Sequence, residues 1–280
     1  NKSDKFIRYW FNADDDDPRH PQFPELRPQI YNHEAMPYEG CILGYFTVWQ
    51  GPENNVCDSL NIQKRNEVLI GWSKDGFHWN RENKKPFLPV SEDFHAWNAG
   101  NVQSTAGSPL IVGDSLYFYV SGRYNSKPKH DSNFATGLAM LRRDGFVSMR
   151  AGRKEGYVEI KTKIPANGNY LFVNADVKGT LAVEVLDDNG QPMEGFTKKD
   201  CISMKKSDKT KQMISWEKHP GVTSLVGKTV RLKFYLNQAD IYAFWISAWQ
   251  TGESGGYTGG GGPGLSDKGI DTPMDKLKNN

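Results

Sequence analysis

Two glutamates and several aromatic residues lie in the segment PQIYNHEAMPYEGCILGYFTVW, residues 28–49. Glu39 directly follows Tyr38 and precedes an apolar run, 40–49, that alternates like a buried strand. Burial beside apolar groups raises the pKa of a carboxyl group, as a proton donor requires. Cleavage of a glycosidic bond needs one such donor and one ionised carboxylate. Glu39 is therefore a candidate acid, and the alternative is a structural hydrogen bond to backbone at a sheet edge.

Residues 12–40, which include Glu39, are expected to form a proline-stiffened loop system rich in charged and aromatic side chains. Functional groups concentrate on such loops when a rigid sheet carries them. The acidic run Asp14–Asp17 suggests calcium, but it lacks the sixth-position glycine and the closing glutamate of an EF-hand loop. We therefore predict a solvated turn there, and no metal and no cofactor for the chain.

A second polar cluster, EDFHAWNAGNVQSTAGSPL at 92–110, contains His95, Trp97, Asn98 and Asn101. A sugar ring needs a flat aromatic face and paired hydrogen bonds to neighbouring hydroxyls, which a tryptophan and amides supply. Asparagine is equally common in loops for turn geometry alone. Arg123, at the end of LYFYVSGR, is a candidate clamp for a carboxylate or sulfate, or else a partner in a structural ion pair.

Short apolar runs separated by Gly, Pro, Asn and Asp predict an all-β chain. The segments EVLIGWSKDGFHW (67–79) and TGLAMLRRDGFVSM (136–149) share a strand followed by Asp-Gly-Phe, and the two Asp-Gly pairs lie 69 residues apart. The Asp-Gly pairs predict tight turns. A repeat of this length predicts β-propeller blades, and two repeats do not close a ring of at least four. We expect residues 1–150 to be a propeller portion of about two to three blades.

After residue 150 the pattern changes to alternation with period two. It predicts a β-sandwich domain over 151–250. The six expected strands are 156–164, 170–177, 180–187, 211–217, 229–236 and 240–248. The glycine-rich residues 251–280 are expected to form a C-terminal tail or a strap.

Composition excludes several classes of protein. The chain of 280 residues carries 35 Lys plus Arg against 33 Asp plus Glu and no basic block, so we predict no nucleic-acid partner. No apolar run approaches the ~18 residues of a membrane-spanning helix, so we predict no membrane association. The odd count of three cysteines favours free thiols over a Cys41–Cys57 bridge. The strand-like start at residues 6–11 suggests a processed or partial chain.

Several stretches, among them DPRHPQFPELRPQIYNHEAMPYEG, WNAGNVQS, LYFYVSGR and LFVNADVKGTLAVEVLDDNGQPMEGF, together resemble the C-terminal portion of secreted bacterial glycosyl-hydrolase-like proteins. These are related to the family 32 and family 43 five-bladed propellers with a C-terminal β-sandwich. The resemblance implies an extracellular or periplasmic protein with a carbohydrate substrate at the propeller axis. It favours Glu39 of PYEG as a catalytic carboxylate, and Asp17 of DDDDP as the second. The blades expected to supply the first carboxylates are not in this sequence, so they would come from the same or another chain.

The leading hypothesis is a glycoside hydrolase, or the C-terminal part of one. Its catalytic residues are Glu39 and Asp17, and its substrate-binding residues are Arg27, Tyr38, His95, Trp97, Asn98, Asn101 and Arg123. The alternative is a non-catalytic carbohydrate-binding or scaffold protein. A third possibility, sugar binding by the sandwich, predicts an exposed aromatic row among Trp216, Tyr235 and Trp245, which alternation otherwise places in the core.

Overall fold

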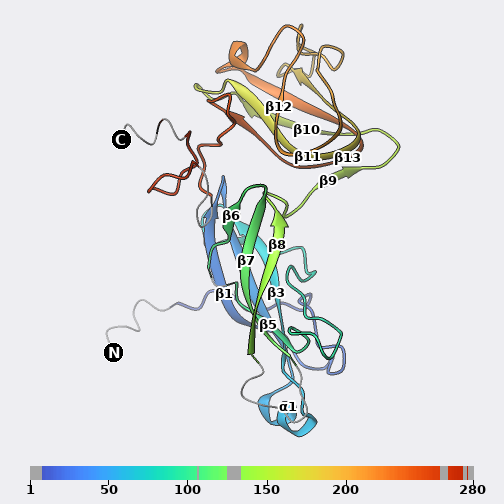
Figure 1. Cartoon of the computed structure of the whole chain (residues 1–280), viewed down its shortest axis with the longest axis vertical. Coiled ribbons are helices and arrows are strands. Elements are labelled where there is room, and N and C mark those ends of the chain that lie inside the picture. Colours follow the sequence, from blue (N-terminus) through green and yellow to red (C-terminus); the bar gives the residue numbers. More distant parts are fainter. Residues whose placement is uncertain (1–7, 106, 125–133, 259–263, 274–275, 277–280) are drawn as a thin grey trace. The chain divides into compact units, whose positions relative to one another are not determined.

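The chain is all-β, as predicted (Figure 1). The computed structural model describes residues 8–105, 107–124, 134–258, 264–273 and 276. Within these residues the strands form three antiparallel sheets, accompanied by helix α1 (Asn54–Leu60) and a 3-10 turn (Thr223–Leu225). Two compact units are formed by residues 1–110 with 117–140, and by residues 111–116 with 141–280. They are called the first and the second unit below.

The first sheet follows chain order, with neighbouring strands antiparallel. Its strands are β1 (Gln29–Tyr38), β2 (Cys41–Gly51), β3 (Arg65–Ser73) and β4 (Trp79–Asn80). The apolar run in β2 is buried on both faces, as a continuous apolar sequence requires. On one face Tyr45 meets the ring of Phe118, with ring centroids 5.9 Å apart. On the other face Phe46 packs against Phe11 and Trp79.

The second sheet is centred on β7, which pairs with the other three strands. Its strands are β5 (Asn101–Gln103), β6 (Leu110–Val112), β7 (Ser115–Arg123) and β8 (Phe134–Arg142). The two Asp-Gly turns follow β3 and β8, but β3 lies between β2 and β4, whereas among the described residues β8 pairs with β7 alone, so the predicted blade repeat is not confirmed. The strands after these turns differ, because β4 pairs with β3 whereas β9 (Met149–Ala151) pairs with β13 of the third sheet.

The third sheet contains five strands in the order β10-β13-β11-β12, with β9 beside β13. Their bounds are β10 (Gly156–Lys163), β11 (Tyr170–Leu186), β12 (Met204–Ile214) and β13 (Thr229–Ser247). The sequence predicts strands in the same regions, but it divides β11 and β13 into two strands each. The predicted breaks are bulges in continuous strands, where the pairing shifts register between Val177 and Thr180 of β11.

The strand β13 shows why the sequence suggests a break there. Its buried apolar residues are even-numbered up to Leu236 and odd-numbered from Ala239 onward. Alternation with period two therefore loses its phase at residues 237 and 238, which resembles a turn between two strands. Instead, the bulge lies opposite Gly179 of β11, where an added Cβ would lie 2.4 Å from the carbonyl oxygen of Asn237. The close approach of the two backbones explains the glycine.

The core of the second unit lies against one face of this curled sheet. The predicted second sheet of a sandwich is not found among the described residues. Two loops contribute to the core instead, through Phe196 and Cys201 of the first and Trp216, Val222 and Leu225 of the second. A sheet face buried under loops gives the same alternation in sequence as one buried under a second sheet, and this is why the two arrangements look alike.

Other sequence expectations have simple outcomes. Residues 8–11 do not form a strand, and residues 6 and 7 lie outside the described residues. The three cysteines are free thiols, as favoured. No helix in the described part of the chain is long and apolar enough to span a bilayer. In the glycine-rich C-terminal region, Tyr257 bridges to Ile270, and residues 259–263 lie outside the description.

Candidate functional site

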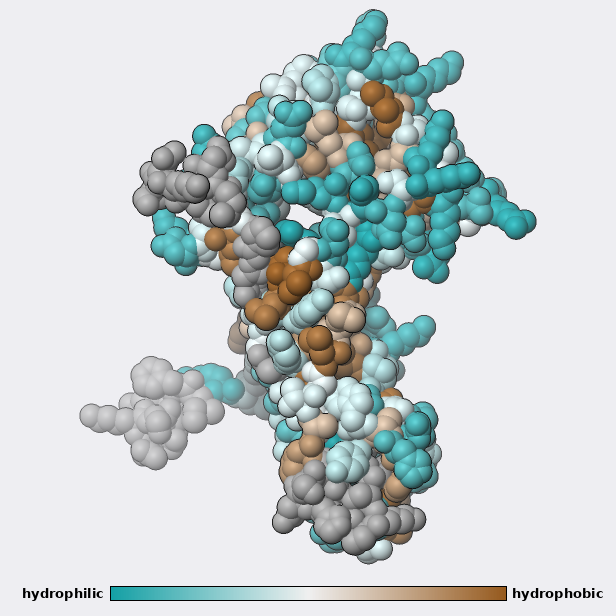
Figure 2. All heavy atoms as spheres, viewed as in Figure 1, coloured by the Kyte–Doolittle hydropathy of each residue, from teal (hydrophilic) through white to brown (hydrophobic). Residues whose placement is uncertain are grey.

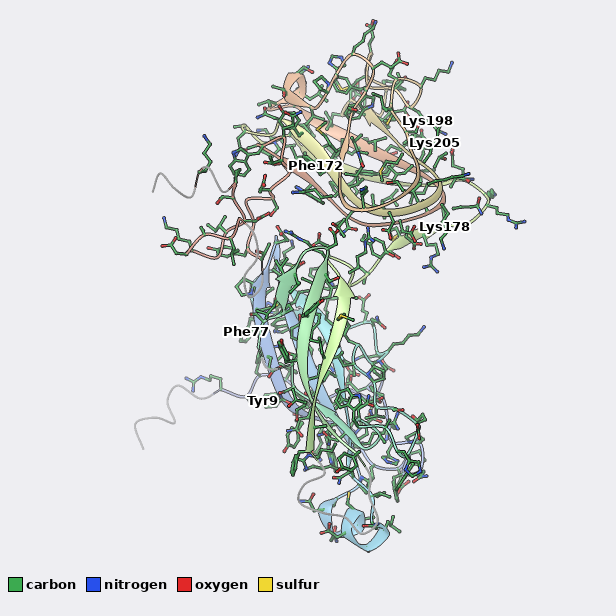
Figure 3. The ribbon with its side chains drawn as sticks, in the orientation of Figure 1. Tyr9, Phe77, Phe172, Lys178, Lys198 and Lys205 are labelled. Atoms are coloured by element: carbon green, nitrogen blue, oxygen red, sulfur yellow. The ribbon has the colours of Figure 1, made fainter. Side chains whose placement is uncertain are left out.

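An open hollow on the first unit carries exposed aromatic rings beside charged side chains. It has a volume of about 1090 Å³. Its aromatic members Trp10, Trp72 and Phe77 are 37%, 46% and 59% exposed. Phe77, labelled in Figure 3, belongs to the first Asp-Gly-Phe turn. Lys74 and Glu82 are among the exposed charged residues that line the same hollow.

Trp79, which lines the hollow, belongs to a tightly packed aromatic layer. His33 stacks on Phe46 with ring centroids 4.4 Å apart, and Trp79 lies edge-on to both rings. Gly44 makes this possible, because an added Cβ would lie 2.4 Å from the Trp79 ring and 2.8 Å from His33 Nε2. Burial, together with the positive charge of Arg81, lowers the pKa of His33. The imidazole is therefore held in its neutral form under the rings.

The Asp75 turn fixes the rim of the hollow. The Oδ1 atom of Asp75 accepts hydrogen bonds from the backbone N–H groups of Phe77 and His78, at 2.9 and 2.8 Å. The hydroxyl of Ser73 accepts the backbone N–H of Gly76 at 2.9 Å, and Gly76 has φ +75°. Trp10 also holds the turn in place. Its indole Nε1 donates a hydrogen bond to the carbonyl of Phe77 at 2.8 Å, and the two rings stack. The aromatic rim is thus pre-organised.

One wall of the hollow is a charge network built on a buried carboxylate. The side chain of Asp17 is fully buried and accepts two hydrogen bonds from Arg81, at 2.7 and 2.9 Å. Lys84 reaches the same carboxylate at 3.2 Å and also pairs with Asp14. Burial tends to raise the pKa of Asp14, but the hydrogen bond from Lys84 and the charges of Lys84 and Arg81 outweigh it, so this pKa is lowered. Asp14 is therefore kept ionised by its partners, and Asp17 is tied into the same network by Arg81 and Lys84.

Glu39 and Asp17 lie on different segments of the first unit. Glu39 lies at the tip of the β1–β2 hairpin with φ +49°, next to the Tyr38–Cys41 pair. Asp17 is held by Arg81, whose side chain lies beside Gly71, the partner of Gly44.

Three other predicted residues lie apart from the hollow. Tyr38 is buried in the strand next to the hairpin tip, so its ring packs in the interior rather than facing a ligand. Arg27 is exposed in the loop before β1. His95 is exposed too, and its backbone N–H donates to the carboxylate of Asp93 at 3.0 Å.

The side chains of the predicted tryptophan-amide cluster pack and form hydrogen bonds within the protein. The Trp97 ring covers two strand glycines, since a Cβ on Gly122 or Gly137 would lie 2.3 or 2.2 Å from it. Asn98 donates to the carbonyl of Pro89 at 3.2 Å. The buried Asn101 donates to the carbonyl of Lys64 at 3.0 Å, while its Oδ1 atom is buried without a partner.

Arg123 is not paired with an acid in any contact of the described residues. Its guanidinium lies over the ring of Phe134, 4.4 Å from the centroid. Its backbone pairs with Asn101 across β5 and β7. Among the described residues a cation–π contact stands in place of the structural ion pair, and the anion clamp stays a prediction.

The exposed aromatic row that sugar binding by the second unit would require is not formed by Trp216, Tyr235 and Trp245. Trp216 is buried, and its indole donates to the carbonyl of Val183 at 2.9 Å. Trp245 stacks on Phe172, labelled in Figure 3, with centroids 5.7 Å apart. Tyr235 donates to Glu184 at 2.7 Å. These side chains have structural partners, so the hollow of the first unit is the better candidate site.

Sequence reasoning missed the residues of the hollow. The Asp75-Gly76-Phe77 motif predicts a turn alone, and Trp10 and Trp72 belong to segments that predict strands. The signal that could have found them is an aromatic residue placed directly after a rigid turn, where it has no strand neighbour to bury it. Among the described residues, no group of three or more His, Cys, Asp or Glu is arranged to hold a metal ion.

Comparison with known proteins gives few matches. No protein-family model matches the chain, and no curated protein matches it. Among solved structures it is similar to a proposed glycoside hydrolase from Parabacteroides distasonis ATCC 8503, with 15% identity and a TM-score of 0.26. The likeness covers 60% of this chain and 53% of that protein, so the chain spans about half of its length. At this TM-score the likeness carries no argument about activity.

Proposed function

We propose that this protein binds carbohydrate in the open hollow of the first unit. One observation carries the proposal: three exposed aromatic rings, Trp10, Trp72 and Phe77, share an open hollow with charged side chains. Sugars have apolar ring faces and a periphery of hydroxyls, so they suit an aromatic surface surrounded by charged hydrogen-bonding groups. The size of the hollow, about 1090 Å³, is sufficient for an oligosaccharide.

The rigid rim supports this proposal. Phe77 and Trp10 are held by the Asp75 turn and by the indole-to-carbonyl hydrogen bond before any ligand arrives. A ligand that stacks on such rings does not have to order them first, so little conformational entropy is lost on binding. Loops of this kind on a rigid sheet are a common location for binding sites.

The proposal places the site within a larger glycoside-hydrolase-like protein. In it, the two four-stranded sheets are blades of a propeller, the third sheet belongs to a sandwich-like domain, and the protein acts outside the cytoplasm. Two blades do not close a ring of at least four, so further blades from the same or another chain complete it. Hydrolysis is the catalytic version of this proposal, with Glu39 as acid and a second carboxylate on a further blade. Asp17 is left out of that version because Arg81 and Lys84 already neutralise it.

Ligand binding to the full chain tests the proposal. A panel of cello-, xylo- and arabino-oligosaccharides is titrated by calorimetry and by tryptophan fluorescence. Trp72→Ala and Phe77→Ala each remove an exposed ring, and we expect either to weaken binding by about 5- to 30-fold, at ~1–2 kcal/mol for a stacked ring. Tyr31→Ala is the matched control, since Tyr31 is 49% exposed in the same unit and does not line the hollow. Binding unaffected by both ring deletions would refute the site.

A further inference from the structure

Lysines are concentrated in one segment of the second unit. Residues 198–211, from the loop before β12 into the second half of that strand, contain six lysines and two aspartates, which gives a net charge of +4. The whole chain has a net charge of +2, so the rest of the chain is slightly negative. Other residues separate the lysines in the sequence, and they therefore form no continuous basic block.

Five of these lysines are exposed and form no ion pair with an acid within the described residues. They are Lys199, Lys205, Lys206, Lys209 and Lys211. The sixth, Lys198, pairs with Glu155 at 2.6 Å. We call the five the lysine edge, because four of them lie on β12, the last strand in the order of the third sheet. Lys205 is labelled in Figure 3, and Figure 2 shows hydrophilic side chains projecting from the outside of the second unit.

The two aspartates of the segment do not neutralise the lysine edge. Asp208 pairs with Arg142 instead. Asp200 accepts hydrogen bonds from the hydroxyl and the backbone N–H of Thr197, at 2.7 and 3.1 Å. Both carboxylates are thus held by other groups, and the positive charge of the five ammonium groups is left to the solvent.

The backbone of β12 contributes to the exposure of these lysines. Lys206 lies at a bulge, where the pairing of β12 with β11 shifts register between Lys205 and Ser207. Alternation is interrupted at a bulge, and the neighbouring residues Lys205 and Lys206 are both exposed. Lys206 has φ +46°, a left-handed conformation that glycine or asparagine adopts more easily. A lysine kept at a conformational cost indicates a role for its side chain.

Protection of a free sheet edge accounts for only part of this arrangement. Lysines on an edge strand discourage pairing with a further strand. A bulge has the same effect by twisting the edge, and β12 already contains one. Lys199 lies outside the strand, where edge protection does not need it. Neighbouring ammonium groups also repel one another, and a bound anion relieves this repulsion.

The chemistry of the segment favours one class of anion. Nucleic-acid bases stack on aromatic side chains, and residues 198–211 contain none. A lipid surface takes up a row of apolar side chains, whereas Ile202 is the one large apolar residue of this segment that is exposed. Sulfate and carboxylate groups along a polysaccharide need only the ammonium donors that the lysine edge supplies.

We propose that the lysine edge binds an acidic polysaccharide, whose sulfate or carboxylate groups accept hydrogen bonds from the ammonium groups. Anions repeated along one polymer contact several lysines at once, so individually weak contacts combine into useful affinity. The inference does not rest on the proposed function, because the lysine edge and the hollow of the first unit share no residue.

Binding of defined polymers to the full chain tests the inference. Heparin supplies sulfate groups, polygalacturonate supplies carboxylate groups, and dextran is the uncharged reference. We expect calorimetry at low salt to show binding of at least one acidic polymer and none of dextran, and we expect added salt to weaken it. A triple variant with Lys205→Glu, Lys206→Glu and Lys209→Glu is expected to raise the Kd by about 10-fold or more.

The matched control changes the net charge by the same amount at exposed lysines elsewhere in the second unit. It carries Lys163→Glu, Lys228→Glu and Lys268→Glu, and we expect its Kd to change by less than about 2-fold. Circular dichroism checks folding, and glutamine replaces glutamate at the three β12 positions if the first variant does not fold.

Loss of binding confined to the β12 variant supports the proposal. Three results overturn it: neither acidic polymer binds, both triple variants lose affinity equally, or double-stranded DNA binds as tightly as the acidic polymers.

Discussion

The Nδ1 atom of His78 lies 2.7 Å from Oδ2 of Asp75, while Oδ1 of the same carboxylate accepts the backbone N–H groups of Phe77 and His78. The hydrogen bond to His78 is the largest cause that lowers the pKa of Asp75, and the two backbone bonds add to it. One carboxylate therefore closes the turn that presents Phe77 to the hollow. The state of the rim is linked to the ionisation of Asp75.

The first prediction follows from that linkage. A carboxyl group whose pKa is lowered on folding favours the folded turn at pH values above its ordinary value of 3.8, and this contribution is lost as the pH falls below it. We expect His78→Ala to raise the pKa of Asp75 toward the ordinary value, as measured by carbon-13 NMR of the carboxyl group. His95→Ala removes an exposed histidine elsewhere and serves as the control. An unchanged titration of Asp75 in His78→Ala would contradict the assignment.

The second prediction separates a buried ion pair from a surface pair. Asp17→Asn leaves the buried guanidinium of Arg81 without its partner, so we expect the free energy of unfolding to fall by about 3–5 kcal/mol. Asp15→Asn breaks the exposed pair with Arg19 and is expected to cost less than about 0.5 kcal/mol. Urea denaturation measures both. Equal effects of the two substitutions would show that Asp17 is not a structural anchor.

The third prediction concerns the packing of the Trp97 ring against Gly122 and Gly137. In Gly122→Ala the new methyl group would lie 2.3 Å from the Trp97 ring, so we expect a loss of about 1–3 kcal/mol and a change in tryptophan fluorescence. Gly152→Ala is the control, because nothing lies within 4 Å of its added Cβ. Combined with Trp97→Ala, the Gly122 substitution should cost far less. Additive losses would mean that the ring does not pack there.

The fourth prediction addresses hydrolysis. If Glu39 donates the proton, Glu39→Gln in the full-length protein lowers glycan turnover by about 10²–10⁴-fold and leaves sugar binding intact. Glu53→Gln, at an exposed position before α1, is the control. Turnover that survives Glu39→Gln would remove the catalytic version of the proposal while the binding site stands, because the hollow does not include Glu39.

The sequence was sufficient for the strands but not for how they combine. Alternation identifies which residues face a core, and it located β2, β3, β7 and β10. It does not tell a bulge from a turn, so β11 and β13 were each divided in two. The polar first half of β12, Met204 to Thr210, has little alternation, and backbone pairing with β11 makes it a strand. Pairing with neighbouring strands in the folded protein determines that β11 and β13 are continuous and that the first half of β12 is a strand.

The candidate site was harder to foresee for a related reason. The sequence predicts site residues where charged and aromatic side chains lie near prolines. In the structure, however, Asp17 and Asn101 form hydrogen bonds with residues 37 or more positions away in the sequence. Those partners, Arg81 and Lys64, have no sequence signature that links them. The hollow in turn combines Trp10 with Phe77, which meet only once the first sheet has formed. Long-range contacts of this kind do not leave a local pattern.

The bulges in β11 and β13 have a consequence for how this protein can vary. At Leu236 and Ala239 the inward-facing set switches from even to odd positions, and the strand runs on without interruption. Removal of one residue there would restore plain alternation and keep Ala239 and Ile241 facing the core, whereas removal of one residue from a regular part of the strand would turn the side chains beyond it to the other face. We therefore expect a single-residue deletion to be tolerated better at this point than in the regular part of β13, and outward-facing side chains of the paired strand, such as Lys178 (Figure 3), to be free to change.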